Sequence, residues 1–225
     1  MKKENRKFLS ASICLLAAFV IWTFAVRFLD VQAIGPQGSC VGLATLNGAV
    51  RDFVGSNMSL YMLTDWLGLV PILFALGFAV LGAIQWIKRR RILKVDRDIL
   101  ALGVFYLAVM AAYVLFEEIA INYRPVLIEG ILEVSYPSST TLLATCVMPT
   151  AALVLKRRMK NPIIKCSIVC AIYAFTAFMV VGRIVSGVHW LSDVIGGILL
   201  SLALIFAFRS TLPLVDMPNS TLRMC

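Results

Sequence analysis

Long apolar stretches alternate with short charged segments along the chain, and this pattern predicts six membrane-spanning helices. The predicted spans are residues 8–26, 66–87, 99–116, 140–155, 166–181 and 190–208. A helix needs about 20 predominantly apolar residues to cross the hydrocarbon core of a bilayer. Residues 34–61 are richer in Gly, Ser and Asn, so we expect an extramembrane loop there, with room for an interfacial helix. The pattern therefore predicts an all-α, polytopic membrane bundle.

The composition agrees with a membrane protein and indicates one domain. The chain has 225 residues, 60% of them hydrophobic, and a mean hydropathy of +0.91, which is too apolar for a water-soluble domain. No internal repeat or second domain is visible, so we expect residues 1–225 to form a single six-span membrane domain. The basic start before the first span also suits a signal peptide, but the apolar part is longer than a usual signal core, and we expect a retained helix.

The distribution of Lys and Arg predicts the orientation of the bundle. Of the 21 basic residues, 17 lie before the first span, between spans two and three, between spans four and five, or after the last span, and four lie in the other loops. The positive-inside rule then places both termini in the cytoplasm, as in a bacterial-type plasma membrane. The formal charge of +9 comes from short runs between apolar spans, so we expect no nucleic-acid partner.

The most distinctive segment is GRIVSGVHWLSDVIGG, residues 182–197, which contains the only histidine of the chain. His189 and Asp193 are four residues apart, so on a helix they share one face, where the carboxylate could bond one ring nitrogen. The other nitrogen would be free to react, and Arg183 would suit a phosphate. The alternative interpretation is a satisfied polar pair, or interfacial residues beside Trp190.

A second segment, residues 117–140, lies on the same predicted outer face. Ser138, Ser139 and Thr140 stand directly before an apolar helix, and the amino terminus of a helix binds anions through its dipole and its free N–H groups. Arg124 supplies a second guanidinium for phosphoryl oxygens. A plain helix cap and a snorkelling interfacial arginine remain the alternatives.

These residues resemble the type 2 phosphatidic acid phosphatase superfamily of membrane lipid phosphatases, over about residues 60–210. Its third motif, Arg, five residues, His, three residues and Asp, is matched by Arg183, His189 and Asp193, with Gly182 where Ser is usual. This motif is the most specific of the three.

The other two motifs are altered. Residues 137–140, Pro-Ser-Ser-Thr, stand where the family has Pro-Ser-Gly-His, so Thr140 replaces a histidine. The first motif keeps its end as Arg124 and Pro125, but Glu117 occupies the position of its lysine. The chain therefore resembles a divergent member of the family.

The resemblance implies a phosphohistidine mechanism. His189 would attack phosphorus and Asp193 would hold its tautomer, while the phosphoryl oxygens would be bound by Arg124, Ser138, Ser139 and Arg183. Thr140 cannot act as the usual acid, and losing general acid catalysis costs about 100- to 10,000-fold in rate. Either Glu117 or Glu118 serves instead, or a good leaving group, such as that of a diphosphate, departs unaided.

The sequence thus favours a phosphoric monoester or diphosphate hydrolase acting on a phosphorylated membrane lipid, of the phosphatidic acid or isoprenyl diphosphate type, at the extracytoplasmic face. The alternatives are an impaired family member that binds or moves phospholipids, and a lipid phosphotransferase. The chemistry needs no metal or cofactor, and no protein partner is predicted.

Overall fold

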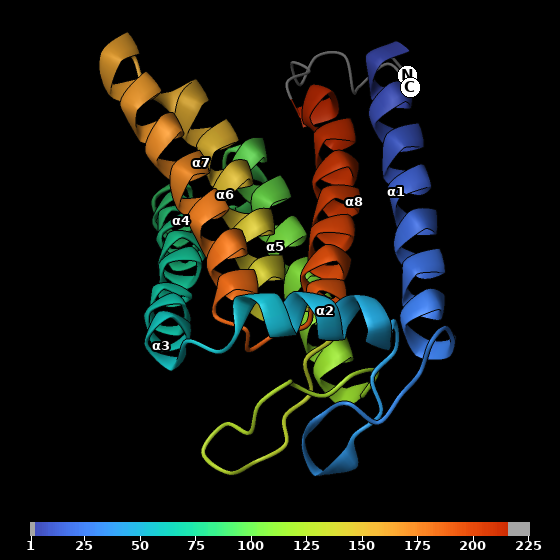
Figure 1. Ribbon diagram of the computed structural model, residues 1–225. Coiled ribbons are helices and arrows are strands. Elements are labelled where there is room, and N and C mark those ends of the chain that lie inside the picture. The colour runs from blue at the N-terminus through green and yellow to red at the C-terminus, as the bar shows by residue number, and fades with distance from the viewer. Residues whose placement is uncertain (1–2, 216–225) are drawn as a thin grey trace.

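The structure is a computed structural model that describes residues 3–215 of the chain, and these residues are all-helical (Figure 1). The α-helices are α1 (Lys3–Phe28), α2 (Ala44–Val54), α3 (Met58–Leu67), α4 (Leu69–Arg89), α5 (Arg97–Glu118), α6 (Ser139–Arg158), α7 (Pro162–Val185) and α8 (Leu191–Val215). Two short 3₁₀ helices, η1 (Pro36–Gly38) and η2 (Ile92–Lys94), lie in the connections. Within residues 3–215 there are isolated β-bridges but no strands.

Six of these helical segments are long and apolar enough to cross a membrane, as the hydropathy pattern predicts. They are α1, the α3–α4 pair, α5, α6, α7 and α8. The chain is therefore an integral membrane protein with an all-α fold. The helices extend beyond the predicted spans, for example to Lys3 in α1, Arg89 in α4 and Arg158 in α6. Long basic side chains permit this, because their apolar stems stay in the membrane while their charges reach water.

The predicted loop of residues 34–61 contains one α-helix, α2, after the short η1, and it ends earlier than predicted. α3 begins at Met58, because Asn57 caps it: the side-chain Oδ1 of Asn57 accepts a hydrogen bond of 3.0 Å from the backbone N–H of Leu60. α3 then meets α4 at Gly68, which keeps helical angles (φ −59°, ψ −19°). The second span therefore runs over Met58–Arg89, 32 residues.

The first and last helices of the chain lie side by side (Figure 1). Ser12 Oγ of α1 donates a 2.8 Å hydrogen bond to the carbonyl of Ala203 in α8, and Trp22 Nε1 donates one of 3.0 Å to the carbonyl of Ser192. The hydrophobic core fills the space between α1, α5, α6 and α8, and α6 and α8 are the most enclosed of the spans. This packing brings the amino termini of α6 and α8 together, where Ser138 N–H bonds to the carbonyl of Asp193 at 3.0 Å.

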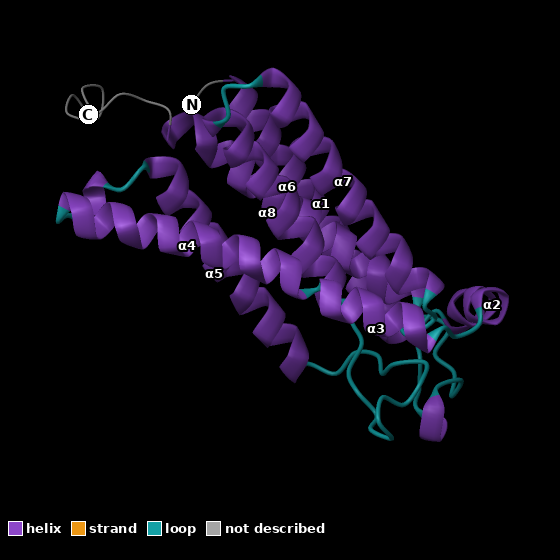
Figure 2. Cartoon of the chain, turned by 90° about the vertical axis from the view of Figure 1, so that its left-hand side faces the viewer, coloured by secondary structure: helices purple, strands orange, loops and turns teal. Residues whose placement is uncertain are grey.

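The two ends of the bundle differ in character. At one end lie α2, the loop of residues 29–43 and the loop of residues 119–138 (Figures 1 and 2). At the other end an ion-pair cluster joins α4, α5 and α6: Asp96 pairs with Arg89 at 2.8 Å and with Arg158 at 3.2 Å. The two segments predicted to carry the chemistry both belong to the first end.

Candidate active site

The turn between α7 and α8 places His189, and its shape depends on a glycine. Gly187 has φ +64°, and a Cβ there would lie 1.8 Å from the carbonyl oxygen of Gly55. The neighbouring carbonyl of Ser186 accepts a 2.9 Å hydrogen bond from Asn57 N–H, which ties this turn to the start of α3. His189 therefore lies in the turn, and only Asp193 is helical, in the first turn of α8. The prediction that both share a helix face is wrong, yet the turn still brings the two side chains together.

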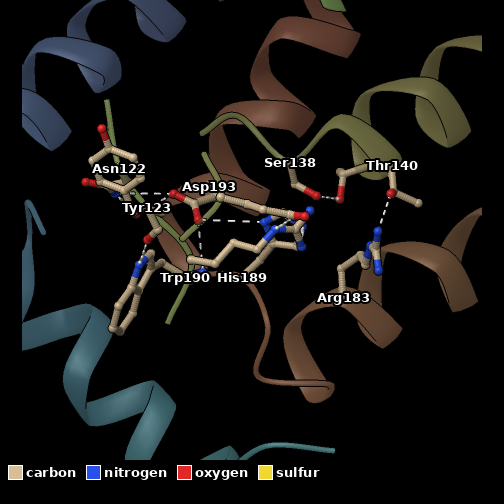
Figure 3. A network of polar contacts seen from close by, with 12 residues as sticks. Asn122, Tyr123, Ser138, Thr140, Arg183, His189, Trp190 and Asp193 are labelled. Atoms are coloured by element: carbon tan, nitrogen blue, oxygen red, sulfur yellow. Dashed lines mark hydrogen bonds and ion pairs between the residues drawn. The ribbon is translucent and has the colours of Figure 1, made fainter. Parts of the chain in front are cut away.

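The Asp193 carboxylate is completely buried beside the His189 ring (Figure 3). Its Oδ2 lies 3.8 Å from His189 Nδ1 and accepts a 3.0 Å hydrogen bond from the backbone N–H of Trp190. Its Oδ1 accepts a 3.3 Å hydrogen bond from Asn122 Nδ2. The 3.8 Å separation is longer than a hydrogen bond, so the carboxylate lies next to the ring nitrogen without bonding to it. The carboxylate is thus placed to orient the ring and to support a positive charge on it.

The second ring nitrogen, Nε2, faces Arg124, whose Nη1 lies 3.2 Å away. A guanidinium can only donate hydrogen bonds, so Nε2 is the acceptor and carries the lone pair. The ring proton then sits on Nδ1, on the side of Asp193. Burial lowers the pKa of His189 well below its ordinary value, and the charges of Arg124 and Arg183 lower it further. The ring is therefore neutral and nucleophilic at Nε2 at physiological pH.

Both arginines lie over the ring of Tyr61, whose centroid is 5.7 Å from Arg124 Cζ and 5.1 Å from Arg183 Cζ. Each guanidinium also pairs with a carboxylate. Arg124 Nε lies 2.9 Å from Glu133, and Arg183 Nη2 lies 3.0 Å from Asp65. These carboxylates occupy positions that the oxygens of an anionic ligand would take.

The amino terminus of α6 contributes the three predicted residues in different ways. Ser138 is completely buried, and its Oγ accepts a 3.0 Å hydrogen bond from Thr141 Oγ1. Ser139 and Thr140 face the cavity next to the arginines. Thr140 Oγ1 accepts a hydrogen bond from Arg183 Nη2 and does not cap the helix, so the cap interpretation is wrong for this side chain (Figure 3). Arg183 also donates to Thr64 Oγ1 at 3.3 Å.

These side chains surround a cavity of about 530 Å³ beneath the loop of residues 119–138. Its polar and charged lining residues are Tyr61, Asp65, Tyr113, Glu117, Arg124, Glu133, Ser139, Thr140 and Arg183. His189 lines a much smaller hollow next to it, and both spaces share Glu117 and Ser139. Glu118 lines neither space. A ligand in the cavity therefore meets the two arginines first and reaches the ring from their side.

The model of the PAP2 superfamily matches residues 116–214, from the end of α5 into α8. This stretch of the chain is similar to the PAP2 superfamily. The PAP2 match contains Arg124, the start of α6 and the whole segment from Arg183 to Asp193. It agrees with the resemblance seen in the sequence motifs.

A solved structure supports the PAP2 fold along almost the whole chain. It is described as the first transmembrane PAP2 type phosphatidylglycerolphosphate phosphatase, from Bacillus subtilis, and it matches with a TM-score of 0.58 at 18% sequence identity. The match covers 92% of this chain and 98% of the other. Comparison with curated proteins finds no match. The family and the fold together support a membrane lipid phosphatase at the family level.

Several residues around the PAP2 site were not predicted from the sequence. Tyr61 and Asp65 belong to α3, outside the matched stretch, and Asn122 and Glu133 belong to the loop before α6. One signal was available, because Asp65 is the single charged residue between residues 60 and 87. A charge inside an apolar span usually faces a partner or a cavity. No sequence signal distinguished Asn122 from an ordinary loop asparagine.

Proposed function

We propose that the protein is a membrane phosphatase that hydrolyses lipid phosphates or diphosphates through a phosphohistidine on His189. The proposal places the site at the outer face, because 17 of the 21 basic residues lie in the segments predicted to be cytoplasmic. The substrate class is a phosphorylated membrane lipid of the phosphatidic acid or isoprenyl diphosphate type.

The reaction proceeds in two displacements. The phosphate enters the cavity and takes the place of the Glu133 and Asp65 carboxylates on the two arginines. Arg124 turns from Nε2 to the phosphoryl oxygens, and the freed lone pair of Nε2 attacks phosphorus while the bond to the leaving oxygen breaks. Water then attacks the phosphorus, the P–N bond breaks, and inorganic phosphate leaves with His189 neutral again. Arg124, Arg183 and Ser139 stabilise the charge on the phosphoryl oxygens in both steps, whereas Ser138 is completely buried and lines neither space.

One observation carries this proposal: the lone pair of His189 Nε2 points at a guanidinium that lines the cavity, while Nδ1 points at the buried Asp193 carboxylate. A histidine whose only role is to pair with a carboxylate would be stabilised by a positive charge on its ring, and two nearby cations oppose that charge. A nucleophilic histidine benefits from the same cations, because they keep its lone pair free and bind the phosphate that it attacks. Asp193 then supports the imidazolium that forms when Nε2 bonds to phosphorus.

The test measures phosphate release by the purified protein from phosphatidic acid, phosphatidylglycerol phosphate and isoprenyl diphosphates in detergent micelles. We expect turnover of at least one of them, with His189→Ala reducing it by more than about 1,000-fold because the nucleophile is lost. Asp193→Asn should lower kcat by about 100-fold and leave KM nearly unchanged, because it removes orientation and charge support from the chemical step.

Ser210→Ala, near the opposite end of α8, is the matched control and should retain parental activity. The rival function is a protein that binds phospholipids without hydrolysing them, favoured by Thr140 in the position of the usual acid. Lipid binding with no phosphate release from any substrate would establish that rival. Activity that survives in His189→Ala would exclude the phosphohistidine.

A further inference from the structure

A chain of buried amides runs from Asp193 away from the cavity to helix α2. Asn122 Nδ2 lies 3.3 Å from Asp193 Oδ1 and 3.4 Å from Ser192 Oγ. Asn47, in α2, donates through Nδ2 to Ser192 Oγ at 2.9 Å, and its Oδ1 accepts from Ser192 N–H at 3.1 Å. These contacts connect the first turn of α8 to an extramembrane helix 145 residues away in the sequence.

The orientation of both amides is fixed by backbone groups. Gly42 N–H, which can only donate, lies 3.3 Å from Asn122 Oδ1, so the Nδ2 end of Asn122 must face the Asp193 carboxylate. Asn47 Nδ2 donates to the carbonyl of Gly42 at 2.8 Å, which fixes Asn47 in the same way. Gly42 cannot carry a side chain here, because a Cβ would lie 1.5 Å from the Val26 carbonyl oxygen.

Burial makes this network costly to disturb. The exposed fractions of Asn47, Asn122 and Ser192 are 1%, 0% and 0%. A buried amide without hydrogen bonds is unfavourable, so each amide stays where all its partners are in place. Asn122 in addition donates to the Asp193 carboxylate, and a hydrogen bond to the charged form of a carboxyl group favours that form.

We propose that Asn122 and Asn47 are positioning residues that set the rotation of the Asp193 carboxylate. Asn122 holds Oδ1, which leaves Oδ2 directed at His189 Nδ1 and at Trp190 N–H. Asn47 holds Ser192, the residue next to Asp193, and so fixes the first turn of α8 against α2. This inference rests on the proposed function, because it assigns Asp193 the role of orienting the nucleophile.

The single histidine of the chain allows a direct test. Protein that carries ¹⁵N-labelled histidine and a purification tag without histidine gives ring-nitrogen signals from His189 alone. In the parent we expect a protonated Nδ1 and an unprotonated Nε2. In Asn122→Leu, which keeps the size of the side chain but removes its hydrogen bonds, we expect a mixture of both tautomers. Asn47→Leu should give a smaller shift in the same direction.

The kinetic readout uses an activated aryl phosphate, p-nitrophenyl phosphate. We expect Asn122→Leu to lower kcat by roughly 10- to 100-fold, the range for partners that orient a functional side chain, with KM within about twofold of the parent. Asn161→Ala is the matched control: it removes an exposed asparagine that caps the start of α7, at the opposite end of the bundle, and should leave the ring signals unchanged.

The tautomer is read without substrate, so an inactive parent would overturn the proposed function and leave the spectroscopic test intact. A parent spectrum dominated by a protonated Nε2 would overturn the positioning role at once. So would an Asn122→Leu protein that is folded and keeps the parental ring signals. If Asn122→Leu does not fold, Asn122→Ser removes the same amide with a smaller change in polarity, and the same outcomes apply.

Discussion

His189 combines burial, two neighbouring cations and a buried anion, and each of these contributes to one property of its ring. Burial and the cations keep the ring neutral, and the anion selects the nitrogen that carries the proton. Such a residue is ready to attack without first losing a proton. The step that lacks a participant is protonation of the leaving oxygen, because Thr140 accepts a hydrogen bond from Arg183 and a threonine hydroxyl does not titrate near neutral pH.

We expect the leaving group to depart unaided, so that diphosphates and activated esters turn over while alkyl monophosphates do so poorly. Thr140→His should then raise alkyl monophosphate cleavage by about 10-fold or more, because it restores an acid beside the cavity. Phosphate release from an alkyl and an aryl monophosphate measures the difference.

The rival acid is Glu117, which lines both hollows of the site and is exposed. If Glu117 were the acid, Glu117→Gln would slow the alkyl ester far more than the aryl ester. Glu118→Gln is the control, since Glu118 lines neither hollow. Fast cleavage of an alkyl monophosphate that neither Glu117→Gln nor Thr140→His alters would exclude both routes.

The sequence predicted the two arginines and the His–Asp pair of the site but not the residues that contact them. Arg124, Arg183, His189 and Asp193 were expected together, because topology and charge put their segments at one end of the bundle, and the structure places them there. Asp65, Glu133 and Asn47 were not, because their contacts depend on which helix faces lie opposite each other. Hydropathy reports how long an apolar helix is and says nothing of its rotation.

At the scale of helices, the contact between α3 and α7 explains the glycine that stands where the resemblance expects a serine. A Cβ on Gly182 would lie 2.7 Å from Thr64 Cγ2, a severe overlap. We predict that Gly182→Ser lowers the free energy of unfolding by about 1–3 kcal/mol, the usual cost of overpacking, as measured by denaturant unfolding in mild detergent.

Thr64→Ser offers a specific rescue. This substitution removes the methyl group that would overlap with a side chain at position 182. It keeps the hydroxyl group that accepts a hydrogen bond from Arg183. The double variant should recover most of the lost stability, giving a coupling free energy of at least about 1 kcal/mol between the two positions. Strictly additive effects of the two substitutions would contradict the proposed clash.

The ends of the helices were predicted less well than the number of membrane spans, and Asn57 and Gly68 show why. The chain enters α3 through a side-chain cap, and it passes from α3 to α4 without leaving helical angles. The hydropathy of a stretch of sequence depends on which residues it contains and not on their hydrogen bonds, so it predicts neither feature. The predicted loop therefore ran into α3, while the interior of each span was located correctly.

At the scale of the whole molecule, the orientation in the membrane is predicted from charge alone and can be tested with single cysteines. In a background without the six native cysteines, Ile131→Cys lies on the loop beside the site and Leu93→Cys lies at the opposite end. Both side chains are highly exposed, 63% and 88%, unlike the buried Asn122 and Ser186 nearer the site.

We expect an impermeant thiol reagent to label Ile131→Cys on intact cells and Leu93→Cys only after permeabilisation. On intact cells, labelling of Ile131→Cys should approach completion while labelling of Leu93→Cys stays at background, since a bilayer separates the two positions. The reverse pattern would place the site at the cytoplasmic face.

The pairing of α1 with α8 has a consequence for how the protein is made. α1 leaves the ribosome long before α8, with which it packs, and at about 5–20 residues per second that delay is roughly 10 to 40 s. Throughout this interval the nascent chain holds α1 in the membrane with Ser12 and Trp22 lacking their partners in α8. Chains released early by the ribosome would thus carry all the arginines of the cavity and still be inert, exposing an unpaired first helix to quality-control proteases.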